Sequence, residues 1–200
     1  MSPPFRLVDP DPAYHRSFLA AADEFIEAGQ APYAGIPSLA ADNGFAGVHF
    51  TRAGLEGPDE FARLVEHLLL DRLEDAPRPR GWVPATVKWL VEDQEYVGRV
   101  SVRHRLTDDL LTWGGHIGYG VRPTVRGRGA ATFALGAVLP VCREHGIDPA
   151  LVTCDVDNEA SRRTIERNGG VYEDTRQGKL RYWVPTVPFE TAAPSAPQDR

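Results

Sequence analysis

The sequence contains the stretch Tyr119-Gly-Val-Arg-Pro-Thr-Val-Arg126-Gly-Arg-Gly-Ala-Ala131, which is its most informative part. A β-prone segment runs into a basic turn with two glycines, and an alanine-rich helix begins directly after the turn. Gly127 and Gly129 allow the backbone to turn tightly and to approach a ligand. The free N–H groups at the start of the helix attract negative charge, and Arg126 and Arg128 suit phosphate. The stretch predicts a pyrophosphate-binding loop that differs from the P-loop and from dinucleotide-binding folds.

Two motifs in this chain resemble the signatures of the Gcn5-related N-acetyltransferases, the GNAT superfamily. Arg126-x-x-Gly129-x-Ala131 is similar to the acyl-CoA loop of that superfamily. Asn158-Glu-Ala-Ser161, followed by Ile165-Glu-Arg-Asn-Gly169-Gly170, is similar to its second signature, the helix beside the pantetheine arm. The resemblance covers residues 84–184 well and the first eighty residues by element order, and it extends to a bacterial subgroup of uncharacterised predicted acetyltransferases.

The periodicity of apolar residues predicts an α/β (α+β) fold of order β-α-α-β-β-β-α-β-α-β-β, a mixed central sheet as in the N-acetyltransferase fold that the motifs imply. The second helix is expected to run from Asp59, as its N-cap, to about Leu73. The strand before the basic turn is expected to begin at Trp113. We expect a single domain over residues 1–184 and a flexible tail rich in proline and alanine over 185–200.

Composition narrows the class of protein. The net charge of −6 argues against nucleic acid as a partner. No segment has the length of a membrane span and the N-terminus lacks a signal pattern, so we expect a cytoplasmic protein. Cys142 and Cys154 are expected to be buried free thiols. The first 75 residues carry 13 acidic and 5 basic side chains, which would either steer a cationic amine or form an ordinary solvated surface.

The resemblance implies acetyl-CoA as co-substrate and no metal. It places the contacts with CoA largely on backbone atoms of Val121, Arg126, Gly127, Arg128, Gly129, Ala130, Ala131 and Asn158. Asn158 can also cap the helix that follows it.

The strand before the loop is rich in glycine. By alternation, His116, Gly118 and Gly120 share one face, while Ile117 and Tyr119 lie on the other. Glycine weakens a strand unless a backbone or a ligand approaches it closely. In the superfamily the backbone of this strand pairs with pantetheine; tight helix packing is the alternative reason for the glycines.

Catalysis requires a group that removes the amine proton and a group that protonates the departing thiolate. His116 is the first candidate for the base, because imidazole titrates near neutral pH; a structural histidine beside the Gly-Gly turn is the alternative. Glu92 is the rival base, with a solvated hairpin residue as the alternative. Many relatives carry the acid as a tyrosine at the position of Ile165, so water or Tyr182 would have to act here, unless Tyr182 belongs to the core.

The sequence therefore predicts an acetyl-CoA-dependent N-acetyltransferase that acts on a primary amine of a small molecule (an amino acid, a polyamine or an amine antibiotic) by direct attack in a ternary complex. Two alternatives are a protein N-terminal acetyltransferase and a non-catalytic acyl-CoA sensor. No nucleic acid or membrane partner is expected, and a homodimer through the last strands is compatible with this fold.

Overall fold

The computed structural model describes residues 4–36, 49–79 and 81–187. Its strands are β1 (Phe5–Val8), β2 (Ala85–Glu92), β3 (Glu95–Arg103), β4 (Ile117–Val121), β5 (Ala150–Asp155), β6 (Val171–Arg176) and β7 (Lys179–Val184). Its α-helices are α1 (His15–Glu27), α2 (Pro58–Leu70), α3 (Ala130–Glu144) and α4 (Glu159–Arg167). In the part of the chain that the structure describes, no helix has the length and apolar character needed to cross a membrane.

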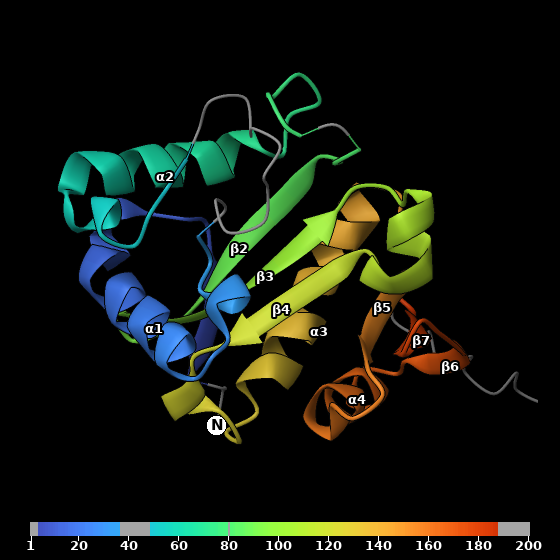
Figure 1. Cartoon of the computed structure of the whole chain (residues 1–200). Coiled ribbons are helices and arrows are strands. Elements are labelled where there is room, and N and C mark those ends of the chain that lie inside the picture. The colour runs from blue at the N-terminus through green and yellow to red at the C-terminus, as the bar shows by residue number, and fades with distance from the viewer. Residues whose placement is uncertain (1–3, 37–48, 80, 188–200) are drawn as a thin grey trace, which may run out of the picture.

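The seven strands form one sheet in the order β1-β2-β3-β4-β5-β7-β6. Every neighbouring pair is antiparallel except β4 and β5, which are parallel and pair only at Ile117 and Val152. The connection from β4 to β5 runs through α3, as a parallel crossover requires. Beyond Ile117 the two strands diverge, as Figure 1 shows between the β4 arrow and β5. The predicted fold class and element order are confirmed.

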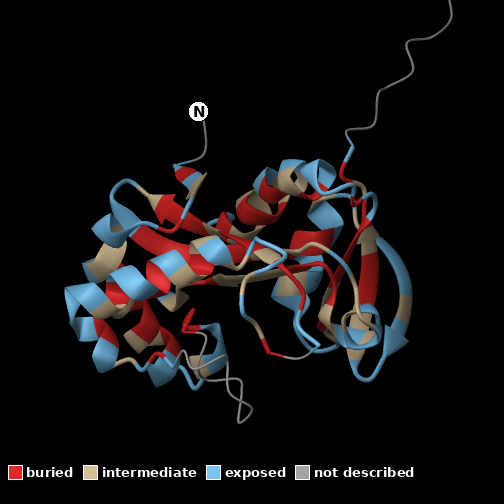
Figure 2. Cartoon of the chain, turned by 90° about the horizontal axis from the view of Figure 1, so that it is seen from above, coloured by how far each residue is buried: buried red, intermediate tan, exposed pale blue. Residues whose placement is uncertain are grey.

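Two apolar clusters hold the helices against the sheet (Figure 2). On one face, residues of α3 such as Leu135 and Val138 pack with Ile117 and Val152 of the central strands. On the opposite face, α1 and α2 bury an aromatic cluster around Trp89 of β2. The sheet is thus covered on both sides, and the region where β4 and β5 separate lies between the layers.

Several element boundaries differ from the sequence expectation. β4 begins at Ile117 rather than Trp113, because Leu110–Gly114 form a single π-helical turn that ends at Gly115, whose φ is +66°. The second helix is capped by Gly57, not Asp59, because Pro58 occupies its first position. It ends at Leu70 rather than near Leu73.

The C-terminal segment still packs against the domain beyond Val184, the expected domain end. Thr186 is buried, and its N–H and hydroxyl both bond to Asp148 Oδ1. Residues 188–200 of the predicted tail lie outside the described residues, as do residues 37–48 of the long segment between α1 and α2.

Candidate active site

The gap between β4 and β5 exposes backbone groups of β4. Arg122 N donates to Val97 O of β3 at 2.9 Å. Because hydrogen-bonding direction alternates along an antiparallel strand, Tyr119 and Val121 direct their N–H groups away from β3, toward β5. The pairing with β5 has ended at Ile117, so these groups face the gap. An extended amide-bearing chain such as pantetheine fits this edge as an added strand.

The loop before α3 has the conformation that its glycines predict. Gly127 and Gly129 have φ of +79° and +83°, in the region that side chains rarely adopt. A Cβ atom built on either glycine meets no described residue within 4 Å, so the described part of the chain leaves room for a ligand beside both glycines. Gly129 is the N-cap of α3, and no side chain caps that helix. The first N–H groups of α3 are therefore free for an anion, as a pyrophosphate group requires.

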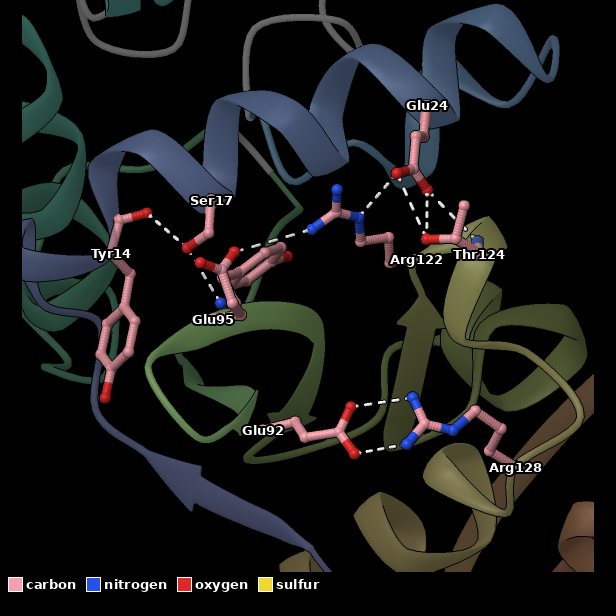
Figure 3. A network of polar contacts seen from close by, with 9 residues as sticks. Tyr14, Ser17, Glu24, Glu92, Glu95, Arg122, Thr124 and Arg128 are labelled. Carbon is pink, nitrogen blue, oxygen red and sulfur yellow. Dashed lines mark hydrogen bonds and ion pairs between the residues drawn. The ribbon is translucent and has the colours of Figure 1, made fainter.

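The two arginines of the loop are held by protein groups. Arg126 donates to Val121 O at 3.1 Å and to Gln30 Oε1 at 2.5 Å. Arg128 forms a bidentate ion pair with Glu92, at 2.9 and 2.5 Å, as seen in the lower part of Figure 3. Glu92 thus serves as the partner of a loop arginine at the end of β2, and both of its carboxylate oxygens are engaged.

A second polar network ties α1 to the same loop (Figure 3). Glu24 of α1 accepts from Arg122 Nε at 2.8 Å and from both the N–H and the hydroxyl of Thr124. Arg122 and Thr124 also hold the pKa of Glu24 below its usual value, against the opposing effect of burial. The segment that leads into the acyl-CoA loop is therefore fixed against α1.

A hydroxyl cluster lies beside the gap, on the α3/α4 face of the sheet. Tyr119 of β4 and Ser161 of α4 share a hydrogen bond of 2.7 Å between their hydroxyl oxygens. Burial raises the pKa of Tyr119 to about 12, so this phenol keeps its proton at neutral pH. The Cys154 thiol of β5 lies in the same region; burial raises the pKa of that thiol, and the Ser161 side chain lowers it. Three elements thus bring protonated groups together where β4 and β5 diverge.

The second motif has the local geometry that its sequence predicts. Asn158 caps α4, since its Oδ1 accepts from Ser161 N at 3.0 Å. Among the described residues, none accepts a hydrogen bond from its amide nitrogen, which could therefore donate to a ligand. Ile165 is fully buried in the core and carries no hydroxyl. Cys142 and Cys154 are both buried and free, as expected.

Tyr182 belongs to the core cluster. It is buried, and its hydroxyl donates to Glu166 Oε1 of α4 at 3.4 Å. Burial, followed by the charge of Glu166, raises its pKa. The phenol hydroxyl thus already donates to a protein group, which opposes a role as general acid. That role stays a prediction.

His116 joins β4 to β5. Its backbone N donates to Leu151 O at 2.7 Å, and its ring Nδ1 accepts from Leu151 N at 2.9 Å. A neutral imidazole has one acceptor nitrogen, and here that nitrogen is occupied. Burial, then the charge of Arg103, lowers the pKa of His116 to about 4. The base role of His116 stays a prediction, and this hydrogen bond opposes it.

The comparisons with known proteins agree with this geometry. The model of the acetyltransferase (GNAT) domain matches residues 51–171, more than half of the chain. The chain belongs to this family. It is an acetyltransferase, and the open loop and free helix N-terminus are the features that fit the pyrophosphate of a coenzyme A co-substrate. Comparison with curated protein sequences gave no match.

Solved structures with the same fold include acetyltransferases. The microcin C7 self-immunity acetyltransferase MccE, in complex with acetyl-CoA and AMP, is 18% identical with a TM-score of 0.57, over 90% of this chain and 92% of its own. RimJ of Mycobacterium smegmatis in complex with CoA-disulfide is 16% identical with a TM-score of 0.58, over 90% and 80%. An acetyltransferase of Salmonella typhimurium that modifies the N-terminal serine of ribosomal protein L7/L12 is 15% identical with a TM-score of 0.53, over 92% and 95%.

Tyr119, whose hydroxyl lies beside the gap, was not among the candidate site residues predicted from the sequence. Alternation already placed Tyr119 on the face opposite Gly118 and Gly120, which is the face that α4 covers. The hydroxyl at Ser161, one helical turn before Ile165, was the second signal, because residues four apart lie on the same side of a helix.

Proposed function

We propose that this enzyme transfers the acetyl group of acetyl-CoA to a primary amine of a small molecule, by direct attack within a ternary complex. The observation that carries the proposal is the free edge of β4 at Tyr119 and Val121, which continues into the glycine loop and the uncapped start of α3. That path would hold the pyrophosphate at the loop and the thioester at the gap. The proposed CoA contacts are Val121, Arg126, Gly127, Arg128, Gly129, Ala130, Ala131 and Asn158.

The two faces of the gap suit two different reactants. Side chains of Tyr119, Ser161 and Cys154 fill the α3/α4 face. Gly118 and Gly120 leave the α1/α2 face of β4 bare of its own side chains, and Phe25 and Tyr33 lie over Gly120 on that face. An amine that approaches from the bare face would reach the thioester carbon without displacing the co-substrate, which is the geometry of a ternary complex.

The hydroxyl pair Tyr119–Ser161 is our candidate for the group that assists departure of the thiolate. It lies beside the gap, and Tyr119 is protonated at neutral pH because of its raised pKa. A hydroxyl that donates to developing negative charge on sulfur lowers the barrier without becoming ionised itself. This pair would take the place of the tyrosine that is absent at Ile165.

Two measurements test the proposal. The first follows the release of free thiol from acetyl-CoA with amino acids, polyamines, amine antibiotics and short peptides as acceptors. The second measures the binding of acetyl-CoA by calorimetry. Turnover of a small-molecule class supports the proposal. Turnover of peptides alone would favour protein N-terminal acetylation, the alternative suggested by the substrate of the Salmonella neighbour. Binding without turnover of any acceptor would favour an acyl-CoA sensor, and the absence of binding would refute the assignment of the loop.

We also retain the cytoplasm as the proposed location, where acetyl-CoA is made and used.

A further inference from the structure

The bare face of β4 is bordered by two arginines of β3. Gly118 and Gly120 are in register with Ser101 and Arg99 of β3, and Arg103 lies further along the same face. A Cβ atom on Gly118 would meet Ser101 Oγ at 3.6 Å and both terminal nitrogens of Arg103 at 3.7 Å. The guanidinium of Arg103 therefore lies directly over the glycine strand. We call these five residues the arginine face.

Arg103 is held in place while three of its five N–H donors have no acceptor among the described residues. Its Nη1 donates to Gly114 O at 2.9 Å and to Gly115 O at 3.1 Å. Within the described residues, no acceptor is bound to Nε or Nη2 of this side chain. Those two nitrogens form the edge that binds a carboxylate through two parallel hydrogen bonds. A fixed guanidinium with this edge free is preorganised for such an anion.

Arg99 adds a second positive charge to the same face. Arg99 and Arg103 are close enough to repel each other, and this repulsion, after burial, lowers the pKa of Arg103. No carboxylate in the part of the chain that the structure describes lies within ion-pair distance of either arginine. Two uncompensated, partly buried guanidinium groups are costly unless an anion binds them.

The acidic side chains near the site are already neutralised by other arginines. Asp23 and Glu24 of α1 bind Arg52 and Arg122, and Glu92 binds Arg128. The acidic N-terminal half therefore does not make the bare face negative. A polyamine or another polycation would meet Arg99 and Arg103 there, which disfavours that class of acceptor.

The arginine face is one residue away from the predicted reaction centre. Gly118 lies under Arg103, and its neighbour Tyr119 directs its N–H into the gap. Consecutive Cα atoms are about 3.8 Å apart. A molecule that binds Arg103 through a carboxylate can thus present an amine to the gap only if the two groups are a few bonds apart.

We propose that Arg103 and Arg99 form a carboxylate-binding site for the acceptor, so that the substrates of this enzyme are free amino acids. The proposal rests on the proposed function of the same site, and it selects one class among small-molecule amines. Arg103 would bind the carboxylate in bidentate fashion, and Arg99 would supply the second charge.

The decisive experiment compares each common amino acid with its own carboxamide as acceptor, by thiol release from acetyl-CoA, with polyamines in the same panel. The carboxamide keeps the amine and the side chain and removes only the charge. A charge-assisted pair contributes about 1.5–3 kcal/mol, so kcat/KM should be about 10- to 100-fold higher for the acid. The ratio should fall to near one in Arg103→Gln, and it should fall partly in Arg103→Lys, which keeps the charge but loses the bidentate edge.

Two further variants separate recognition from folding. Arg103 also supports the Gly114–Gly115 turn, so its replacement could disturb the fold there. Arg99 makes no side-chain hydrogen bond with the described residues, and Arg99→Gln therefore provides an independent test of the same face. Arg105→Gln is the matched control: it removes one positive charge two residues from Arg103, where the side chain is exposed and bound to Glu74. The acid-to-amide ratio should fall in Arg99→Gln and stay unchanged in Arg105→Gln.

A second readout does not depend on turnover. Calorimetry in the presence of CoA compares the binding of N-acetyl amino acids with that of N-acetyl amino acid amides. Tighter binding of the acids than of the amides, with this difference lost in Arg103→Gln, supports the carboxylate site. If that result is found while no amine is acetylated, the proposed function is refuted and the carboxylate site is not. Acetylation of amides or polyamines at the rate of acids, or equal binding of acids and amides, overturns the carboxylate site and leaves the proposed function standing. A preference for amides would point to a peptide N-terminus instead.

Discussion

Replacing Gly129 with valine should abolish tight acetyl-CoA binding while the protein stays folded. A side chain at φ +83° is strained by about 1–3 kcal/mol, which a domain of ordinary stability tolerates. The valine methyl groups would occupy the empty space above the loop and block phosphate from the first N–H groups of α3. Loss of one or two charge-assisted hydrogen bonds costs about 3 kcal/mol, or on the order of 100-fold in Kd.

Gly178→Val is the matched control for this variant. Gly178 has φ of +75° and also has nothing within 4 Å of a built Cβ, but it lies in the turn between β6 and β7. Both variants should lose similar unfolding free energy in urea titrations, and only Gly129→Val should lose affinity in calorimetry. Equal affinity of Gly129→Val and the wild type, or an equal loss in both variants, would refute the assignment of the loop.

Three more predictions follow from the contacts of the site. Glu92→Gln should release Arg128 and leave kcat within about twofold. KM for acetyl-CoA should fall a few-fold, because the Glu92–Arg128 ion pair that is removed contributes up to about 1 kcal/mol. Steady-state kinetics check both values, and a large loss of kcat would restore Glu92 as the base. Tyr119→Phe should lower kcat about tenfold with KM for acetyl-CoA unchanged, whereas Tyr182→Phe should change neither; equal effects would remove the hydroxyl pair from the mechanism. Burial lowers the pKa of His116 to about 4 in the folded state, whereas the unfolded chain protonates this residue near pH 6.5. Its contribution to the free energy of unfolding, up to about 3 kcal/mol, is therefore present above pH 6.5 and is lost as the pH falls toward 4. In urea titrations across this range, the free energy of unfolding should depend less steeply on pH for His116→Asn than for the wild type, and an equal steepness would contradict the lowered pKa.

Much of the fold could be predicted because its signals are local. The alternation in β2 and β3, the turn at Asp93 and the Asn158 cap each depend on a few neighbouring residues. The start of β4 could not be predicted in this way. Leu110–Gly114 form a π-helical turn whose shape depends on contacts with Arg103 and Thr153, which are distant in sequence or on another strand.

The site shows the same division. The loop glycines were predictable because a turn into a helix demands their backbone freedom, and their φ values agree. The roles of the candidate catalytic residues could not be predicted in this way. The sequence makes His116 an attractive base, but only the structure shows that its acceptor nitrogen binds Leu151 N. Likewise, Arg128 pairs with Glu92, which is 36 positions away in the sequence, and neither of the two GNAT-like motifs indicates this pairing.

The single pairing between β4 and β5 is the narrowest joint of the sheet. Each half is stiffened by its own ladders, whereas the two halves meet at Ile117–Val152 and at the reciprocal bonds of His116 and Leu151. Val121 lies four residues beyond this joint, about 13 Å along the strand, so a rotation of about 5° at the joint would move it by about 1 Å. A substitution at His116 that tilts β4 by this small angle would therefore displace Val121, a proposed contact of the co-substrate, and would lower turnover without touching that molecule.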